Sequence, residues 1–189
     1  MFYKVQVNDH IRLPPDMFGE DLQQSIIAEI KKKYSGYISK ELGLVIEVAG
    51  VQEIQDGIII PGDGASYYRT IFDVYTFIPE MQEVVPGVIK DIADFGAFIS
   101  IGPIEGMIHI SQTMNDFVSF TKDKVLQGKE SKHSLKVGDK CNARIIAVSY
   151  KDMANPKLGL TMRQPGLGRT DWIDEDLAKG PAKKAAPKK

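Results

Sequence analysis

The chain has few of the features that mark secreted, membrane-spanning or disulfide-bonded proteins. Among its 189 residues there is one cysteine, Cys141, which cannot form an internal disulfide or a thiolate zinc site and fits a reducing compartment. No apolar run reaches about 18 residues, and the N-terminal sequence MFYKVQVNDHIRLPP alternates like a strand before two prolines. We therefore expect a cytoplasmic globular protein with no membrane partner.

Groupings of residues that catalysis or metal binding would need are also missing from the sequence. The three histidines are scattered, and no CxxC or HxxxH spacing occurs. An acidic cluster at 171–176 lies in a tail expected to be flexible, and such a tail cannot hold a hard cation in fixed geometry. We expect no catalytic residue, no cofactor and no metal site.

Charge is balanced over the whole chain but not along it. The net charge is −1, yet residues 1–83 hold 7 Lys and Arg against 13 Asp and Glu, while residues 84–165 hold 11 against 8. Nucleic acid favours a positive surface, because each neutralised phosphate releases condensed counterions. The middle segment is therefore the better candidate to touch RNA, and its modest surplus favours weak, salt-sensitive binding.

The N-terminal half predicts an α+β fold, with one helix against a small antiparallel sheet. Strands are expected at 1–13, 43–54, 58–61 and 67–77, with Asp56-Gly57 as a hairpin turn between the second and third. Asp21 is expected to cap the helix, and Lys31–Lys33 complement its C-terminal dipole. The expected apolar stripe of the helix consists of Leu22, Ile26, Ile27 and Ile30.

A short glycine-rich loop, PGDGAS, joins two of these strands. It is not a phosphate-binding loop, because its glycines lead into a strand pattern rather than into a Lys-Ser/Thr pair and a helix. The simplest interpretation is a permissive turn. The functional alternative is a protruding tip, formed by Pro61, Gly62, Asp63 and Gly64, that inserts into a partner.

The most informative segment of the second half reads GVIKDIADFGAFISIGPIEGMIHIS, from Gly87 to Ser111. Alternation sends Ala97, Ile99, Ile101, Ile108 and Ile110 to the core and places Phe98 and His109 together on an open face. A ring and an imidazole side by side suit single-stranded RNA, although a lone pair of this kind also fits an ordinary surface. The whole pattern, DFGAFxxxG with EGxxHxS, favours RNA because it resembles the S1 motif.

The remainder of this half predicts a five-stranded S1/OB-type barrel. The spacing of Ile89 and Ile92 indicates a bulge in the first strand, and CNARIIAV and KLGLTM supply the last two strands, with Cys141 in the core. Residues 116–136 are expected to form a helical turn and an exposed loop. We expect Trp172 to dock onto this protein or a partner, and the last ten residues to be disordered. The predicted domains are 1–80, 81–165 and a C-terminal extension at 166–189.

Three strings go beyond a generic S1 barrel: EVVPGVIKDIADFGAFISIGPIEGMIHISQT, VGDKCNARIIAVS and LGLTMRQPGLGRTDWI. Together with MFYKVQVNDHIRLPP and the PGDG loop, they resemble the family of archaeal RNA polymerase E-prime subunits, counterparts of the eukaryotic polymerase II stalk subunit seven. The resemblance covers nearly the whole chain. It implies a truncated ribonucleoprotein-like N-terminal domain that docks on the polymerase core near the clamp, and a barrel beside the RNA exit path.

The same resemblance implies a non-catalytic subunit that pairs with a smaller subunit, called F, in a stalk. This stalk would bind nascent single-stranded RNA and assist DNA opening. Phe95, Phe98 and His109 fall on the family's stacking and polar positions. Ser149 replaces the usual acid and Lys157 the usual arginine, which favours contact without base recognition. The expected supporting cations are Lys90, Arg144, Lys157 and Arg163.

Two rival functions stay open at the level of the sequence. One is a pure assembly module in which both domains make only protein contacts, which the missing acid and arginine support. The other is a translation or RNA-decay factor that carries an S1 barrel, although such a factor would lack the polymerase-like N-terminal half.

Overall fold

The computed structural model describes residues 1–121, 123–150 and 156–178, with the side chain of residue 176 left aside. The chain divides into two compact units, Met1–Pro79 and Glu80–Lys189. Within the described ranges, no helix has both the length and the apolar character needed to cross a bilayer. Each unit is described separately below.

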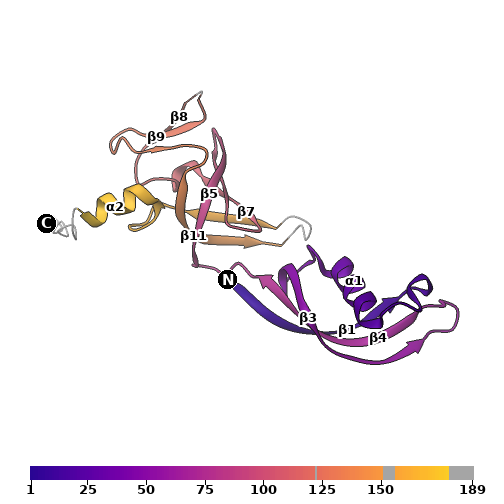
Figure 1. The fold of residues 1–189 in the computed structure, drawn as a ribbon. Helices are drawn as coiled ribbons and strands as arrows, with labels where there is room; N and C mark the ends of the chain where they lie inside the picture. The colour runs from indigo at the N-terminus through magenta and orange to yellow at the C-terminus, as the bar shows by residue number, and fades with distance from the viewer. Residues whose placement is uncertain (122, 151–155, 179–189) are drawn as a thin grey trace. The chain divides into compact units, whose positions relative to one another are not determined.

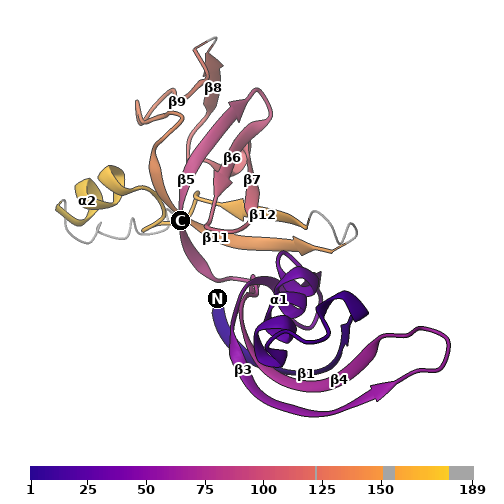
Figure 2. The ribbon, with the colours of Figure 1, turned by 45° about the vertical axis from the view of Figure 1, so that its right-hand side comes forward.

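The first unit is a four-stranded antiparallel sheet with one helix on one of its faces (Figures 1 and 2). The strands follow the order β1 (Phe2–Leu13), β4 (Ser66–Phe77), β3 (Gly43–Ile59) and β2 (Ile38–Ser39). A 3₁₀ turn, η1 (Pro15–Met17), follows β1, and the helix α1 spans Leu22–Tyr34. The predicted α+β architecture is confirmed.

Helix α1 begins where the sequence predicts, because the Asp21 side chain accepts a hydrogen bond from the backbone N–H of Gln24 at 3.0 Å. Ile26 and Ile30 are fully buried against the sheet. Leu22 was expected in the same stripe but is 40% exposed. Its position in the first turn explains the difference, since helical side chains lean toward the N-terminus and this one leans past the helix end.

The predicted hairpin at Asp56-Gly57 is wrong, because β3 runs through it without turning. The strand pairs with β4 along its length and absorbs its extra residues in four register shifts, the last between Ile54 and Gly57. A Cβ at position 57 would lie 2.6 Å from the ring of Tyr68. The glycine there is explained by this close approach of an aromatic ring rather than by a turn.

The second unit contains the predicted five-stranded barrel. Its strands are β5 (Val84–Ala93), β6 (Gly96–Ser100), β7 (Glu105–His109), β11 (Lys140–Ser149) and β12 (Lys157–Thr161). They follow the order β12-β7-β6-β5-β11, and pairing of β11 with β12 closes the barrel. The expected bulge in the first strand lies between Ile89 and Asp91.

The alternation predicted for the barrel core is confirmed at all but one position. Ala97, Ile99 and Ile108 are fully buried, and Cys141 lies in the core as expected. Ile110 is only half-buried, because β7 ends at His109 and the chain enters a 3₁₀ turn, η2 (Ile110–Gln112). The change of backbone geometry cancels the two-residue periodicity on which that expectation depended.

Residues 116–136 do not form the helical turn and loop that the sequence suggested. They contain a three-stranded sheet of order β10-β9-β8, with β8 at Val118–Thr121, β9 at Val125–Gly128 and β10 at Ser134–Leu135. The Asp116 carboxylate joins the ends of this segment, since it accepts hydrogen bonds from the backbone N–H groups of Glu130 and Ser131, each at 2.9 Å. Leu126 and Leu135 supply its buried apolar contacts.

The segment after the barrel is ordered further than expected. Strand β13 (Gly168–Arg169) pairs with β11, and helix α2 (Thr170–Ala178) follows in what the sequence indicated as a flexible tail. Trp172 docks onto its own chain, because its ring is stacked on His133 with 4.7 Å between centroids. The predicted disorder of the last ten residues falls outside the described residues.

Candidate nucleic-acid interface

A groove on the outer surface of the barrel brings together three of the predicted RNA-binding residues. Phe98, His109 and Lys157 line it from β6, β7 and β12. Figure 2 shows β6, β7 and β12 as neighbours, and the ladder pairs them directly. We call this surface the stacking groove; its other walls come from Glu105, Gly106, Met107, Gln112, Ile146, Ala147, Ser149, Pro156, Leu158, Gly159 and Leu160.

The aromatic wall of the stacking groove is held by the strand that carries it. Phe98 lies between two fully buried residues, Ala97 and Ile99, so the pleat directs its ring outward. Phe95 packs edge-on against Phe98, with 5.9 Å between ring centroids and 88° between planes, and is itself 47% exposed. An outward ring supported by a second ring offers a flat face to a nucleobase.

His109 stands at the end of β7, directly across the ladder from Gly96. Its Nδ1 atom accepts the backbone N–H of Ser111 at 3.3 Å and lies 2.8 Å from the Ser111 hydroxyl. With Nδ1 engaged as an acceptor, a neutral ring carries its proton on Nε2 and can donate a hydrogen bond. A Cβ at Gly96 would lie 2.2 Å from the carbonyl oxygen of Ile108, so the close approach of these strands requires glycine there.

Lys157 is placed by the closing pair of strands, where it stands opposite Ser149 in the ladder. The two positions at which the chain departs from the family's acid and arginine therefore lie side by side in one groove. An ammonium group can approach a phosphate as a point charge, but it lacks the planar fork that recognises a base edge in two hydrogen bonds. The groove is suited to contact that does not depend on base sequence.

Some walls of the groove could not be found from the sequence. The buried Ala143 and Ile145 predict by simple alternation that Ile146 faces outward and Ala147 inward. A register shift between Ile145 and Ala147 in the β11–β12 ladder instead leaves Ala147 exposed, so that both residues line the groove. Glu105 also lines the groove, and its carboxylate can accept a ribose 2′-hydroxyl while repelling a phosphate.

The remaining predicted cations do not line the stacking groove. Lys90 lies in a second groove on the barrel. Arg144 projects from β11 between the buried Ala143 and Ile145, and its Nε atom is buried without a hydrogen-bond partner among the described residues. Arg163 lies beyond the end of β12 and donates from Nε to the Asn115 side chain at 3.1 Å.

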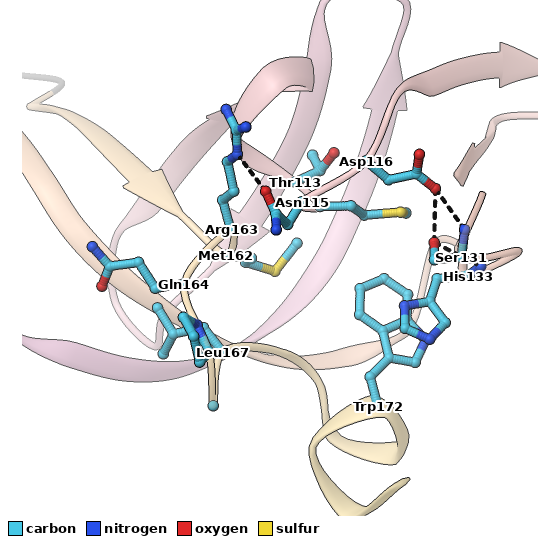
Figure 3. A pocket seen from close by; sticks show the side chains of 13 residues that line it. Thr113, Asn115, Asp116, Ser131, His133, Met162, Arg163, Gln164, Leu167 and Trp172 are labelled. Carbon is cyan, nitrogen blue, oxygen red and sulfur yellow. Dashed lines mark hydrogen bonds between the residues drawn. The ribbon is translucent and has the colours of Figure 1, made fainter. Parts of the chain in front are cut away.

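Arg163 borders a third pocket, drawn in Figure 3, whose wall includes the MRQPGL part of the LTMRQPGLG string. The stacked rings of Trp172 and His133 close one side of it, and Asp116 and Ser131 are hydrogen-bonded beside them. In this view the Arg163 guanidinium lies on the far side of the pocket from Trp172. The string thus packs α2 and the inserted sheet against the barrel.

The predicted tip of the first unit is a braced loop between β3 and β4. Arg12 holds the Asp63 carboxylate with two hydrogen bonds, from Nε at 3.1 Å and from one terminal nitrogen at 2.9 Å, and the Tyr67 hydroxyl donates a third. The Arg12 guanidinium, with help from Tyr67, lowers the pKa of Asp63 to about 2. At neutral pH the ionised Asp63 carboxylate therefore tethers the loop to β1 through Arg12.

Beside this loop is an apolar surface that sequence reasoning did not assign to the tip. Ile58, Ile59 and Ile60 are all largely exposed, Ile59 at 64%. Three consecutive isoleucines could have signalled the surface, but the sequence was interpreted there only as a short strand. Large apolar side chains exposed together are typical of protein interaction surfaces.

Comparison with known proteins agrees with both halves of the structure. Residues 8–64 match the SHS2 domain found in the N terminus of Rpb7p and Rpc25p, and residues 78–153 match the S1 RNA binding domain. The chain is 36% identical to the DNA-directed RNA polymerase subunit Rpo7 of Saccharolobus solfataricus over 93% of its length and 98% of the relative's. It is 33% identical to the same subunit of Sulfolobus acidocaldarius over 95% of its length and 98% of the relative's.

A more distant relative extends the likeness to eukaryotes. The chain is 26% identical to the DNA-directed RNA polymerase III subunit RPC8 of Bos taurus, over 80% of its length and 78% of the relative's. The sequence similarity to these relatives extends along both units, so it covers the N-terminal domain as well as the barrel. The chain belongs to the Rpo7 family of DNA-directed RNA polymerase subunits, which are non-catalytic and carry an S1 RNA-binding domain, the catalytic centre lying in other chains.

Proposed function

We propose that this chain forms a stalk on the polymerase with the smaller partner called F, holds nascent single-stranded RNA in its barrel and assists opening of the DNA. The observation that carries the proposal is the stacking groove, where Phe98, His109 and Lys157 meet from three strands. A ring, a hydrogen-bond donor and a cation correspond to the base, sugar and phosphate of one strand. Such contacts tolerate any sequence, which a transcript-binding surface needs.

Docking on the polymerase core, near its clamp, is assigned to the tip at 61–64. The Arg12–Asp63 ion pair tethers the loop to β1, which reduces the conformational entropy that the loop loses on insertion. The exposed Ile58–Ile60 segment beside it offers apolar area for burial. Both features support a tip that plugs into a preformed pocket of another chain.

Pairing with the smaller stalk partner is assigned to the first unit. Phe2, Ile46 and Tyr75 are exposed apolar residues of β1, β3 and β4, and their neighbours Val45 and Val74 face the helix-covered core. Alternation therefore places these side chains on the sheet face that α1 leaves open. An open sheet face with exposed apolar residues around the Lys4–Asp73 ion pair supports a heterodimer, and a stalk anchored at one end can bias the DNA-opening step through that contact.

The RNA assignment is tested by filter binding and crosslinking of the stalk complex with a transcript-length oligonucleotide. Phe98→Ala should weaken binding by about 1 to 3 kcal/mol, the loss expected for one stacked base. Phe117→Ala is the matched control, because Phe117 is a 70% exposed phenylalanine of the same unit that does not line the groove. It should leave the affinity unchanged.

Two results would contradict the proposal. Equal losses from Phe98→Ala and Phe117→Ala would mean that the groove has no special role. Unchanged affinity in Phe98→Ala and His109→Ala, combined with loss of assembly on deleting the barrel, would favour the alternative of a module with purely protein contacts. This alternative is worth testing because Ser149 and Lys157, which are neighbours in the ladder, stand where the family usually has an acid and an arginine.

A further inference from the structure

The second groove of the barrel, which contains Lys90, has no role in the function proposed so far. Its walls come from β5, β6, β11 and the first residue of α2, and they include Lys140 at the start of β11. We call it the lysine groove. Lys90 and Lys140 are 50 positions apart in the sequence, so only the fold brings these two cations to one surface.

The positive charge of the lysine groove is not neutralised by the protein. Among the described residues, neither Lys90 nor Lys140 takes part in an ion pair, and no carboxylate lines the groove. The acids next to its lining residues along the chain are engaged elsewhere: Asp91 by Lys124 at 2.7 Å, and Asp139 and Asp171 by Arg169 at 3.6 and 2.6 Å. Two like charges on one concave surface repel each other unless an anion lies between them.

Beneath the cations the groove is apolar and offers only a few polar groups. Pro86 and Val88 line it from β5, and Ser100 and Asn142 line it from the neighbouring strands. An apolar floor with hydroxyl and amide groups can receive a ribose or a base edge, while ammonium groups take the phosphates. A free inorganic anion would not need the apolar floor.

The lysine groove and the stacking groove adjoin at one ladder pair, Ser100 with Glu105, whose members line one groove each. Val88 pairs with Lys140 on one side and with Ser100 on the other, so these three residues form a row across three adjacent strands. Ser100 then pairs with Glu105, which lines the stacking groove. Ser100 is also two residues from Phe98 on the same strand face, a separation of about 7 Å.

We propose that the lysine groove is a second contact for single-stranded RNA, in which Lys90 and Lys140 neutralise phosphates of the strand that leaves the stacking groove across Ser100. The inference rests on the proposed RNA-binding function and assigns Lys140 and Asn142 to it. The charge of the groove and the ladder pair at which it adjoins the stacking groove favour the nucleic-acid backbone over an acidic protein segment. The track would thus run over the outer faces of β7, β6, β5 and β11.

The test compares short and long oligouridines on the stalk complex, of about 5 and about 15 nucleotides, which bracket the site sizes of single OB-type folds. The variant Lys90→Ala/Lys140→Ala should leave the short oligomer's affinity unchanged. For the long oligomer it should make the negative slope of log affinity against log salt shallower by about 1.4, which is about 0.7 for each lost phosphate contact on a single strand. Lys140→Arg should preserve the slope.

A matched control separates local contacts from net charge. Lys31→Ala/Lys40→Ala removes the same two charges from exposed positions of the first unit and should leave both slopes unchanged. Equal slope losses in the two double variants, or no loss in either, would overturn the lysine groove. Loss of polymerase association without any change in RNA binding would also overturn it, and would assign the groove to an acidic protein partner.

Failure of this inference is distinguishable from failure of the proposed function. If Phe98→Ala still weakens the binding of both oligomers while Lys90→Ala/Lys140→Ala changes the binding of neither, the RNA assignment of the stacking groove is retained and that of the lysine groove is wrong. If Phe98→Ala also has no effect, RNA binding by this face is wrong as a whole. Unchanged thermal unfolding of each variant shows that the result is not caused by misfolding.

Discussion

The two units pair their strands mainly antiparallel, with one parallel pair between β7 and β12 in the barrel, but they treat the ends of their sheets in opposite ways. The first sheet is open, with β1 and β2 at its edges and α1 on one face. The barrel closes on itself through β11 and β12. An open sheet offers a face and unpaired strand edges that another protein can cover. A closed barrel has no free edges and offers mainly side chains for contact, which suits a ligand that must be released.

Charge and surface chemistry follow the same division. Residues 1–83 are acidic, with 13 acids against 7 bases, and their exposed apolar side chains gather at the tip and on the open sheet face. The barrel instead offers Phe98 and Lys157 in one groove and two uncompensated lysines in another. The surface that we propose for assembly and the surface that we propose for RNA thus belong to separate cores.

The largest expected effect tests whether the two cores are energetically independent. Phe72 is fully buried in the first unit and packs edge-on against Tyr34 at 5.0 Å. Phe72→Ala should lower the free energy of unfolding of that unit by about 3 to 5 kcal/mol. Hydrogen exchange followed by mass spectrometry should show the loss of protection in 1–79 and not in the barrel.

Ile99→Ala is the reciprocal variant, because Ile99 is fully buried in the barrel. It should cost about 2 to 5 kcal/mol and raise exchange only in the second unit. If either variant opens both units to the same extent, they form one cooperative body and the comparison between them fails.

The next effect concerns the tip. Ile59→Ala removes three buried carbons if the tip inserts, which should weaken docking on the core polymerase by about 2 kcal/mol, or about thirtyfold. RNA affinity of the stalk complex should not change. Tyr37→Ala, which removes a 46% exposed side chain beside β2 at the end of the sheet away from the tip, should leave core docking intact. Equal docking losses from both would contradict the assignment of the tip.

A smaller effect follows from the Arg12–Asp63 clamp. The folded pKa of Asp63 is about 2, below the ordinary value of about 3.9. A depressed carboxyl pKa contributes stability that is fully present above about 3.9 and is lost as the pH falls through about 2. An NMR titration should place the Asp63 midpoint near pH 2 in the wild type.

Arg12→Ala should return that midpoint toward the ordinary value, since the guanidinium is the main cause of the lowered pKa. Arg69→Ala is the control, because Arg69 is an arginine of the same sheet whose Nε bonds the Asn8 side chain instead. A midpoint in Arg12→Ala that stays near the wild-type one would show that the tip is held by other contacts.

The smallest effect concerns the barrel's single thiol. Burial raises the pKa of Cys141 to about 12, so the reactive thiolate is scarce at neutral pH. Iodoacetamide should label the folded chain very slowly at pH 8 and label it readily in denaturant. Rapid labelling of the native protein would show that the start of β11, beside the lysine groove, opens frequently.

Local periodicity predicted the elements whose neighbours lie close in sequence. The Asp21 cap, the buried Ile26 and Ile30, and the outward phase of Phe98 all follow from spacing, because helix and strand geometry repeat every 3.6 and 2 residues. The same reasoning failed at Asp56-Gly57, where the glycine makes room for the ring of Tyr68 instead of forming a turn. It also failed at 116–136, where the Asp116 carboxylate holds a segment of short strands together by hydrogen bonds to residues 14 and 15 positions later in the chain.

The sequence by itself determined the family, the two-part organisation and the open-face pair Phe98 and His109, since each depends on a motif or on a local period. Only the tertiary structure decided which distant residues share a surface. A register shift placed Ala147 in the stacking groove, and strand pairing brought Lys140 beside Lys90. Register and closure are set by packing over the whole barrel, and no local pattern carries that information.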